Sequence, residues 1–351
     1  MNEGFRPKVS IVIPVYNGAN YMREAIDSAL AQTYSNIEVL VINDGSNDNG
    51  ETDRIAKSYG KRIRYFSKPN GGVATALNFG IEKMEGDYFS WLSHDDMYMP
   101  DKVKAQIELL DILKDKDTVI YSGYNLMNES GKVYATIDFL SQYSQKKLDT
   151  PIFNVLKGLA NGCTMLIPRK YFTVYGSFDP SLPTTQDYEL WFRMFRNVPV
   201  KYSNKINVNM RQHAGQGSKV INTHVEECNK LWISFLKRIT VLEMCRIDET
   251  PELFLKRTRD FLEKTPYKDA YKYCCELEDT GFKYDTLDDC ELVKILCNNY
   301  NNLYLEYHNC QNCRQSVEPF REVSLLFRFT RCIKENGIIY TMHKVVKKVF
   351  G

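Results

Sequence analysis

The chain lacks any long apolar segment. None of its 351 residues belongs to an apolar run of 18 or more, which argues against a transmembrane helix. The opening segment, MNEGFRPKVS, has no apolar stretch typical of a signal peptide, so we expect a cytoplasmic protein. The formal net charge is only +2, and it provides no overall field for nucleic acid or another polyanion.

Several common catalytic motifs are also missing. There is no G-x-G-x-x-G for a dinucleotide and no G-x-x-x-x-G-K-[ST] phosphate loop. The H-E-x-x-H pattern of zinc proteases and the G-x-S-x-G pattern of serine hydrolases are absent too. A bound diphosphate would therefore be held by a metal and side chains rather than by a glycine-rich cradle.

Cysteine is present without the pattern of a disulfide scaffold. The ten cysteines are scattered, and nine of them lie beyond residue 220, whereas secreted disulfide domains are smaller and denser in cysteine. Cys310 and Cys313 form the one C-x-x-C pair, with His308 nearby. A structural zinc site usually needs four ligands in recognisable pairs. We interpret the cysteines as reduced, mostly buried thiols, with zinc at Cys310 and Cys313 as the alternative.

The N-terminal part alternates strand and helix patterns. The run Val9–Val15 is apolar and β-branched, which is typical of a buried parallel strand. Further strands are predicted at 37–42, 63–66 and 87–92, and helices at 20–32, 53–59 and 73–84. Repeated βαβ units predict an α/β fold in which an open, mostly parallel sheet carries helices on both faces.

The pattern loosens after Pro100. We predict helices at 102–113 and 186–196, strands at 118–126, 132–139 and 162–167, and an extended segment at 200–210. From about residue 220 the period is mostly helical. The predicted organisation is an α/β domain over residues 1–219 and a helical C-terminal region over residues 220–351.

Polar turns follow three of the predicted strands. They contain Tyr16-Asn17, Asp44-Gly45-Ser46 and Asp95-Asp96. Ligands of parallel α/β sheets bind outside the carboxyl ends of the strands, so these turns predict one binding rim. Adjacent carboxylates repel one another unless a cation or proton lies between them, and Mg²⁺ or Mn²⁺ binds carboxylate and phosphate oxygens together. A simple turn at Asp44 and a solvated loop or helix cap at Asp95-Asp96 are the alternatives.

Several segments together resemble one enzyme family. Residues 8 to about 217 are similar to the inverting glycosyltransferases of family 2, which have the GT-A fold. The matching segments, in the family's order, are VSIVIPVYN from Val9, VINDGS from Val41, NGGV from Asn70, ALN from Ala76, WLSHDD from Trp91, Gln186-Asp187, RQH from Arg211 and QGS from Gln216.

The resemblance implies a role for each matched position. The nucleotide would be bound by Pro14, Val15, Tyr16, Asn17, Asp44, Lys68, Asn70 and Asp95. Asp96 would be the main metal ligand, with His213 closing over the metal or diphosphate and Arg211 contacting phosphate. Asp187 would be the catalytic base. A helix-start carboxylate at Asp187 and a structural histidine at His213 are the alternatives.

Two positions depart from the family pattern. Gln186 replaces the Glu that often precedes the base, which leaves the base itself in place. Leu77 takes the place of an Arg in the third helix, so a contact to the donor is lost there. These departures concern the identity of the donor and acceptor rather than the reaction.

The C-terminal segment is basic and amphipathic. Residues 320–351 contain seven Lys or Arg and two Glu, so 7 − 2 gives +5, and apolar residues interleave with the charges. This composition suits a helix on the inner face of an anionic membrane. A final helix that packs on the domain and a contact between copies in a homo-oligomer are the alternatives.

The sequence therefore predicts an inverting glycosyltransferase that depends on Mn²⁺ or Mg²⁺. It would move a hexose or N-acetylhexosamine, from a UDP-sugar, to a hydroxyl of a glycan or lipid-linked acceptor in surface polysaccharide synthesis. The rival enzyme is a sugar nucleotidyltransferase, although the glycine-rich basic loop of such enzymes is missing near the first strand. The rival from another class is a non-catalytic nucleotide-sugar-binding or scaffold protein.

Overall fold

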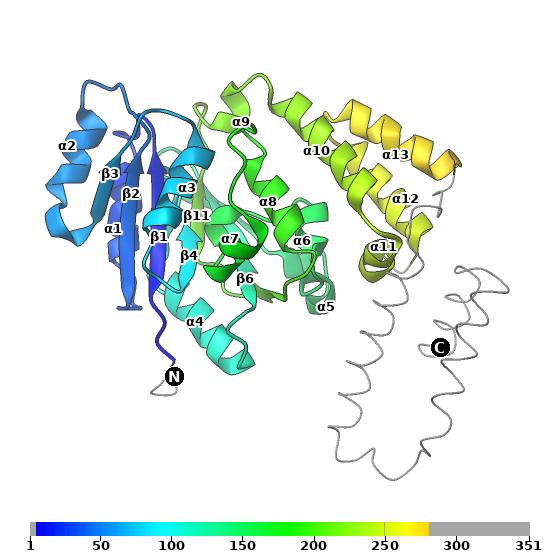
Figure 1. The fold of residues 1–351 in the computed structure, drawn as a ribbon, viewed down its shortest axis with the longest axis horizontal. Coiled ribbons are helices and arrows are strands. Elements are labelled where there is room, and N and C mark those ends of the chain that lie inside the picture. The colour runs from blue at the N-terminus through cyan, green and yellow to red at the C-terminus, as the bar shows by residue number, and fades with distance from the viewer. Residues whose placement is uncertain (1–4, 249, 281–351) are drawn as a thin grey trace, which may run out of the picture. The chain divides into compact units, whose positions relative to one another are not determined.

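A five-stranded sheet forms the centre of the protein. The computed structural model describes residues 5–248 and 250–280, which belong to one compact unit. Strands β1 (Val9–Val15), β2 (Ile37–Asn43), β3 (Arg64–Ser67) and β4 (Tyr88–Trp91) run parallel, and β9 (Ile167–Pro168) pairs antiparallel with β4 (Figure 1). Because β1 is apolar and fully buried along its length, it lies in the middle of the order β3-β2-β1-β4-β9.

The strand order places a switch point between β1 and β4. The chain moves from β1 through α1 (Met22–Leu30) to β2, and through α2 (Glu51–Ser58) to β3. It then returns through α3 (Val73–Lys83) to β4 on the other side of β1. Right-handed crossovers put α1 and α2 on one face of the sheet and α3 on the other. A crevice therefore opens between the carboxyl ends of β1 and β4.

The later strands are shorter than predicted. The predicted strand 118–126 is two strands, β6 (Val119–Ser122) and β7 (Tyr124–Met127), which belong to different sheets. The break falls at Gly123, where a Cβ atom would lie 2.1 Å from the carbonyl oxygen of Ile137. The extended segment 200–210 is likewise two strands, β10 (Val200–Ser203) and β11 (Val208–Arg211).

The strand prediction at 162–167 is wrong. Gly162–Thr164 is a 3-10 turn, and only Ile167–Pro168 pairs as a strand. The turn forms because the Asn161 side chain accepts a hydrogen bond from the backbone N–H of Cys163, 2.9 Å away. Gly162 packs against the ring of Trp91 so closely that a Cβ atom would lie 2.3 Å from it.

The remaining elements surround this centre. A second sheet has the order β5-β11-β7-β8, and β6 pairs with β10. The other strands and helices of the described residues are β5 (Met97–Tyr98), β8 (Val133–Ile137), α4 (Lys102–Leu113), α5 (Gln145–Leu148), α6 (Phe153–Leu156), α7 (Lys170–Tyr175), α8 (Gln186–Met194), α9 (Gly217–Val220), α10 (His224–Arg238), α11 (Val241–Asp248), α12 (Pro251–Leu262) and α13 (Lys268–Thr280).

The helices after residue 220 belong to the same compact unit as the sheet. Helix α10 contacts α8 through the rings of Phe235 and Phe192, which stack with centroids 4.2 Å apart. The predicted boundary at residue 219 lies inside this unit and stays a prediction. No helix among the described residues has both the length and the apolarity to cross a membrane. The basic segment 320–351 and the Cys310–Cys313 pair lie outside the described residues.

Candidate active site

One large cavity lies at the predicted rim. It has a volume of about 670 Å³, and residues from the ends of β1, β2 and β4, from α3 and from the start of α8 line it. Eight of the residues predicted from sequence are among its lining: Pro14, Val15, Tyr16, Asp44, Asn70, Asp95, Asp96 and Asp187. Four others, Asn17, Lys68, Arg211 and His213, are not. The structure thus brings together residues that lie as far apart in the sequence as 14 and 187.

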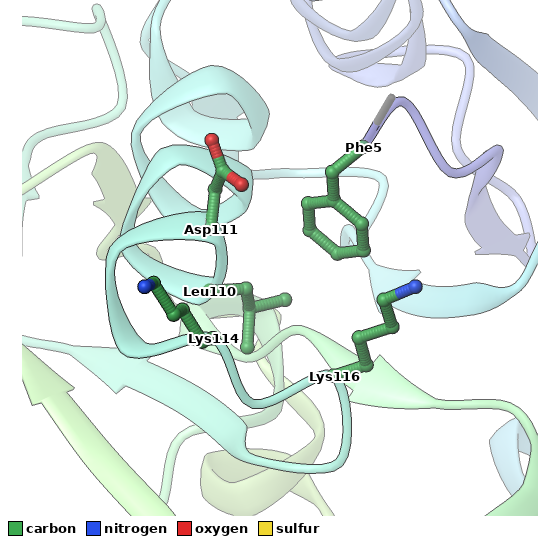
Figure 2. Close-up of a pocket in the computed structure, with 5 residues that line it drawn as sticks. All are labelled: Phe5, Leu110, Asp111, Lys114 and Lys116. Atoms are coloured by element: carbon green, nitrogen blue, oxygen red, sulfur yellow. The ribbon is translucent and has the colours of Figure 1, made fainter. Parts of the chain in front are cut away.

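A second hollow has none of these features. It has a volume of about 210 Å³ and lies among Phe5, Leu110, Asp111, Lys114 and Lys116 (Figure 2). These residues precede β1 or follow the middle of α4, so the hollow is at the amino ends of the strands. Since parallel α/β sheets bind ligands at the opposite edge, the larger cavity is the candidate active site.

Asp44 organises the loop after β3 at the wall of the cavity. Its buried carboxylate accepts hydrogen bonds from the backbone N–H groups of Gly71 and Gly72, at 3.2 and 2.7 Å, and forms an ion pair with Lys68. Gly72 has a φ of +86°, which side-chain-bearing residues rarely adopt. Lys68 therefore contributes by holding Asp44 and this loop, and Asn70 beside them faces the cavity.

Asn17 joins the first two polar turns. Its backbone N–H donates to the Ser46 hydroxyl at 2.8 Å, and its side chain exchanges hydrogen bonds with Asn47 at 2.8 and 2.9 Å. Asn17 therefore fixes the loop after β1 to the loop after β2, and the neighbouring Tyr16 remains 44% exposed at the cavity. An exposed ring at this position is available to stack on a base.

The Asp95-Asp96 pair supplies oxygen ligands suited to a hard divalent cation. Burial and the charge of Asp95 raise the pKa of Asp96 well above its usual range. A cation between the two carboxylates would stabilise their charged forms and so offset that rise. No group of three or more acidic, histidine or cysteine ligands is assembled within residues 5–248 and 250–280, so the protein offers a partial ligand set. Mg²⁺ and Mn²⁺ commonly complete such a set with substrate phosphates.

His213 and Arg211 support this pair. The His213 Nε2 atom lies 2.8 Å from Asp95 Oδ2, so the imidazole adjoins the carboxylate pair without lining the cavity. The buried guanidinium of Arg211 instead donates to the backbone carbonyl of Asp95 at 2.9 Å and to the Glu24 carboxylate at 2.6 Å. These contacts make Arg211 a support for the loop that carries the acidic pair, and its contact with phosphate stays a prediction.

Asp187 lies at the start of α8 and lines the same cavity as the acidic pair. Burial raises the pKa of its carboxyl from 3.8 to about 6, although a hydrogen bond from the backbone N–H of Tyr188, at 2.8 Å, lowers it. A carboxyl group with a pKa near 6 is ionised at neutral pH and basic enough to accept a proton. This position and this pKa are compatible with the general base that the sequence predicts at Asp187, which stays a prediction.

The raised pKa predicts a stability change for Asp187→Asn. The folded pKa exceeds the unfolded one, so ionised Asp187 destabilises the fold above about pH 6, and this cost disappears as the pH falls toward 3.8. A shift of about two units corresponds to at most about 3 kcal/mol. We expect Asp187→Asn to raise the melting temperature at pH 8 and to lose this advantage near pH 4. A melting temperature unchanged at pH 8, relative to the surface control Glu226→Gln, would contradict the raised pKa.

Cys163 is a cavity residue that the sequence prediction missed. Its Sγ lies 3.3 Å from the Ser93 hydroxyl, beside the acidic pair, and burial raises the pKa of the thiol well above its usual range. Because residues 162–167 were predicted to form a strand, Cys163 was not expected at the cavity. The dipeptide Asn161-Gly162 is a turn signal that could have revealed it.

The described architecture is a mostly parallel α/β sheet with a carboxylate-lined cavity at its switch point. Residues 10–173 match the model for "Glycosyl transferase family 2". An uncharacterized glycosyltransferase of Rickettsia prowazekii is 46% identical over 275 residues, which are 78% of this chain and 86% of that protein. The chain belongs to glycosyltransferase family 2, and the prediction of this family from the sequence is confirmed.

Other relatives are longer proteins. An uncharacterized glycosyltransferase of Rickettsia felis is 52% identical over 298 residues, which cover 85% of this chain and 48% of that protein. The chondroitin synthase of Pasteurella multocida is 32% identical over 268 residues, which cover 74% of this chain and 27% of the synthase. The chain thus spans about half the length, or less, of these two relatives.

A solved structure confirms the predicted GT-A fold. The structure of S. aureus TarS 1-349 in complex with UDP-GlcNAc matches 80% of this chain and 95% of its own, with a TM-score of 0.54 and 15% sequence identity. At this identity the similarity concerns the fold alone.

Proposed function

We propose that this protein is an inverting glycosyltransferase that moves a hexose or N-acetylhexosamine from a UDP-sugar to a hydroxyl of a glycan or lipid-linked acceptor. The observation that carries the proposal is the single cavity that holds Asp44, the Asp95-Asp96 pair and Asp187. Family membership supports sugar transfer, and the UDP-GlcNAc bound by TarS supports a UDP-sugar donor. The name of the Pasteurella relative, chondroitin synthase, supports a glycan acceptor.

Each residue has a defined task in the proposed reaction. The loop fixed by Asp44 and the ring of Tyr16 bind the nucleotide, and Asp95 and Asp96 would hold Mn²⁺ or Mg²⁺. The bound cation would neutralise the negative charge that develops on the departing diphosphate. Asp187 takes the proton from the acceptor hydroxyl as that oxygen attacks the sugar carbon from the face opposite the diphosphate. The attack from behind inverts the configuration at that carbon.

A donor-binding screen tests the proposal. The melting temperature is measured with UDP-, GDP-, dTDP- and CMP-sugars, each with Mn²⁺ and with a chelator. We expect only the UDP-sugars to stabilise the protein, and only with Mn²⁺, by about 2.7 kcal/mol at a concentration of 100 Kd. If another nucleotide alone stabilises the protein, the UDP assignment is wrong. If none does so under either condition, the protein is a scaffold with the fold of this family.

A further inference from the structure

The segment that leads into the catalytic helix is held by a helix from a distant part of the chain. Thr184 and Thr185 immediately precede α8, which carries Asp187 in its first turn. The Glu227 Oε2 atom, on α10, accepts hydrogen bonds from the backbone N–H and the hydroxyl of Thr184, both at 2.9 Å. The Thr185 hydroxyl donates to the same oxygen at 3.4 Å. One carboxylate oxygen therefore fixes both threonines.

The other side of the carboxylate is fixed as well. The Thr223 hydroxyl donates to Glu227 Oε1 at 2.7 Å. The Thr184 hydroxyl has one proton, which it donates to Glu227, so His224 Nδ1, 2.9 Å from the same oxygen, must be the donor in that contact. These bonds leave the Glu227 carboxylate one orientation, which points at the start of α8.

Glu227 is satisfied by neutral donors rather than by a cation. None of the ion pairs among residues 5–248 and 250–280 includes it. Burial alone would raise its pKa, but the hydrogen bonds from Thr223, Thr184 and Thr185 outweigh burial and hold the pKa below 4.5. The group is therefore ionised wherever a base with the pKa of Asp187 is active, and it accepts hydrogen bonds throughout that range.

Helix α10 also contacts α8 farther along. Phe235 stacks on Phe192, and Arg196 just beyond α8 donates to the backbone carbonyl of Arg238 at 3.0 Å. Thr184 lines the cavity at the end where Asp187 lies. A displacement of α10 would consequently be transmitted to the cavity wall through Glu227 and Thr184.

We propose that Glu227 is a positioning residue of the active site, which aims the Asp187 carboxylate by holding Thr184 and Thr185 at the entrance to α8. This inference rests on the proposed function in one respect, namely that Asp187 is the base. It makes α10 part of the catalytic unit, although this helix follows residue 219 and carries no residue of the family motifs.

The first test compares Glu227→Ala with Glu226→Ala, whose wild-type carboxylate pairs with the exposed Lys230 in the next turn. Alanine removes every acceptor that Thr184 and Thr185 use, whereas a glutamine oxygen could keep them. Turnover is measured as UDP released from UDP-N-acetylglucosamine with Mn²⁺ and with water as the sugar acceptor, and affinity as the Kd for UDP. We expect Glu227→Ala to lower kcat about 10- to 100-fold, because small misplacements of catalytic groups cost this much. The Kd for UDP should stay within about twofold, and Glu226→Ala should match the wild type. An unchanged kcat in folded Glu227→Ala overturns the proposal.

The second test needs no turnover. Asp187→Asn is introduced into the wild type and into Glu227→Ala, and the gain in melting temperature at pH 8 is compared. If Glu227 keeps Asp187 enclosed, about half or more of that gain disappears in the Glu227→Ala background, because a released carboxylate regains solvent. Equal gains in both backgrounds overturn the proposal. A wild type that releases no UDP contradicts the proposed function, whereas this comparison still decides the role of Glu227.

A milder pair of variants covers the case in which Glu227→Ala does not fold. Thr184→Val removes the hydroxyl that donates a hydrogen bond to Glu227 and keeps the backbone N–H, whereas Thr184→Ser keeps both donors. We expect Thr184→Ser to recover at least about tenfold in kcat over Thr184→Val, with the same Kd for UDP. Equal kcat values for the two variants overturn the proposal.

Discussion

Asp187→Asn should abolish nearly all sugar transfer and leave the donor bound. The amide keeps the size of the side chain, and its oxygen can still accept the hydrogen bond from the backbone N–H of Tyr188, so the start of α8 should be unchanged. What is lost is the ability to accept a proton, and general-base catalysis typically contributes about 10²- to 10⁴-fold. We expect kcat to fall by that factor, with the Kd for UDP and Mn²⁺ within about twofold of the wild type.

The pH dependence of wild-type activity tests independently whether Asp187 is the base. Because burial raises the pKa of Asp187 to about 6, the base is protonated and inactive below that pH. The value of kcat/KM should fall about tenfold per pH unit on the acidic side of pH 6 and stay level just above it. This limb should be missing from the residual activity of Asp187→Asn. If Asp187→Asn turns over like the wild type while donor binding is intact, the base is a different residue.

The parallel sheet and its rim were predictable because they depend on local patterns. A short, apolar and β-branched run such as Val9–Val15 favours a buried strand, and polar turns such as Asp44-Gly45 end such strands. Carboxyl ends of parallel strands share an edge, so the meeting of Asp44 with Asp95 followed from the strand order alone. Asp187 is far from the rim residues in the sequence, so no periodic pattern connects it with them. The family resemblance supplied this residue.

The supporting contacts were not predictable because they depend on tertiary packing. Arg211 was expected at the diphosphate. Its guanidinium donates hydrogen bonds to the Glu24 carboxylate and to the carbonyl of Asp95, and Glu24 is 187 positions away in the sequence. Lys102 gave no signal either. It is buried, it donates to the carbonyl of Met165 at 3.0 Å, and burial lowers its pKa to about 7. Glu227 reads in the sequence as one more charge on an amphipathic helix.

Asp96→Asn should remove the metal-dependent part of donor binding. The Asp96 Oδ1 atom accepts a hydrogen bond from the backbone N–H of Arg211 at 2.9 Å, and an amide oxygen can keep that bond. The substitution therefore removes the charge and preserves the local structure, whereas Asp96→Ala removes both. A carboxylate-to-cation contact is worth several kcal/mol, and each 1.4 kcal/mol changes affinity about tenfold. We expect the Kd for UDP with Mn²⁺ to rise about 100-fold or more in both variants.

In the protein without cation and donor, Asp96→Asn should increase stability, whereas it weakens donor binding when Mn²⁺ is present. This contrast distinguishes a metal ligand from a structural carboxylate. Without a cation, burial and the charge of Asp95 disfavour ionised Asp96, so Asp96→Asn should melt at a higher temperature than the wild type at pH 8 in a chelator. Adding Mn²⁺ and UDP should reverse the order, because only the wild type gains from binding. Glu226→Gln should follow the wild type in both conditions. If Asp96→Asn binds UDP with undiminished dependence on Mn²⁺, the cation is held elsewhere. If the wild type binds UDP equally well in the chelator, donor binding does not need the cation, and side chains of the cleft hold the diphosphate.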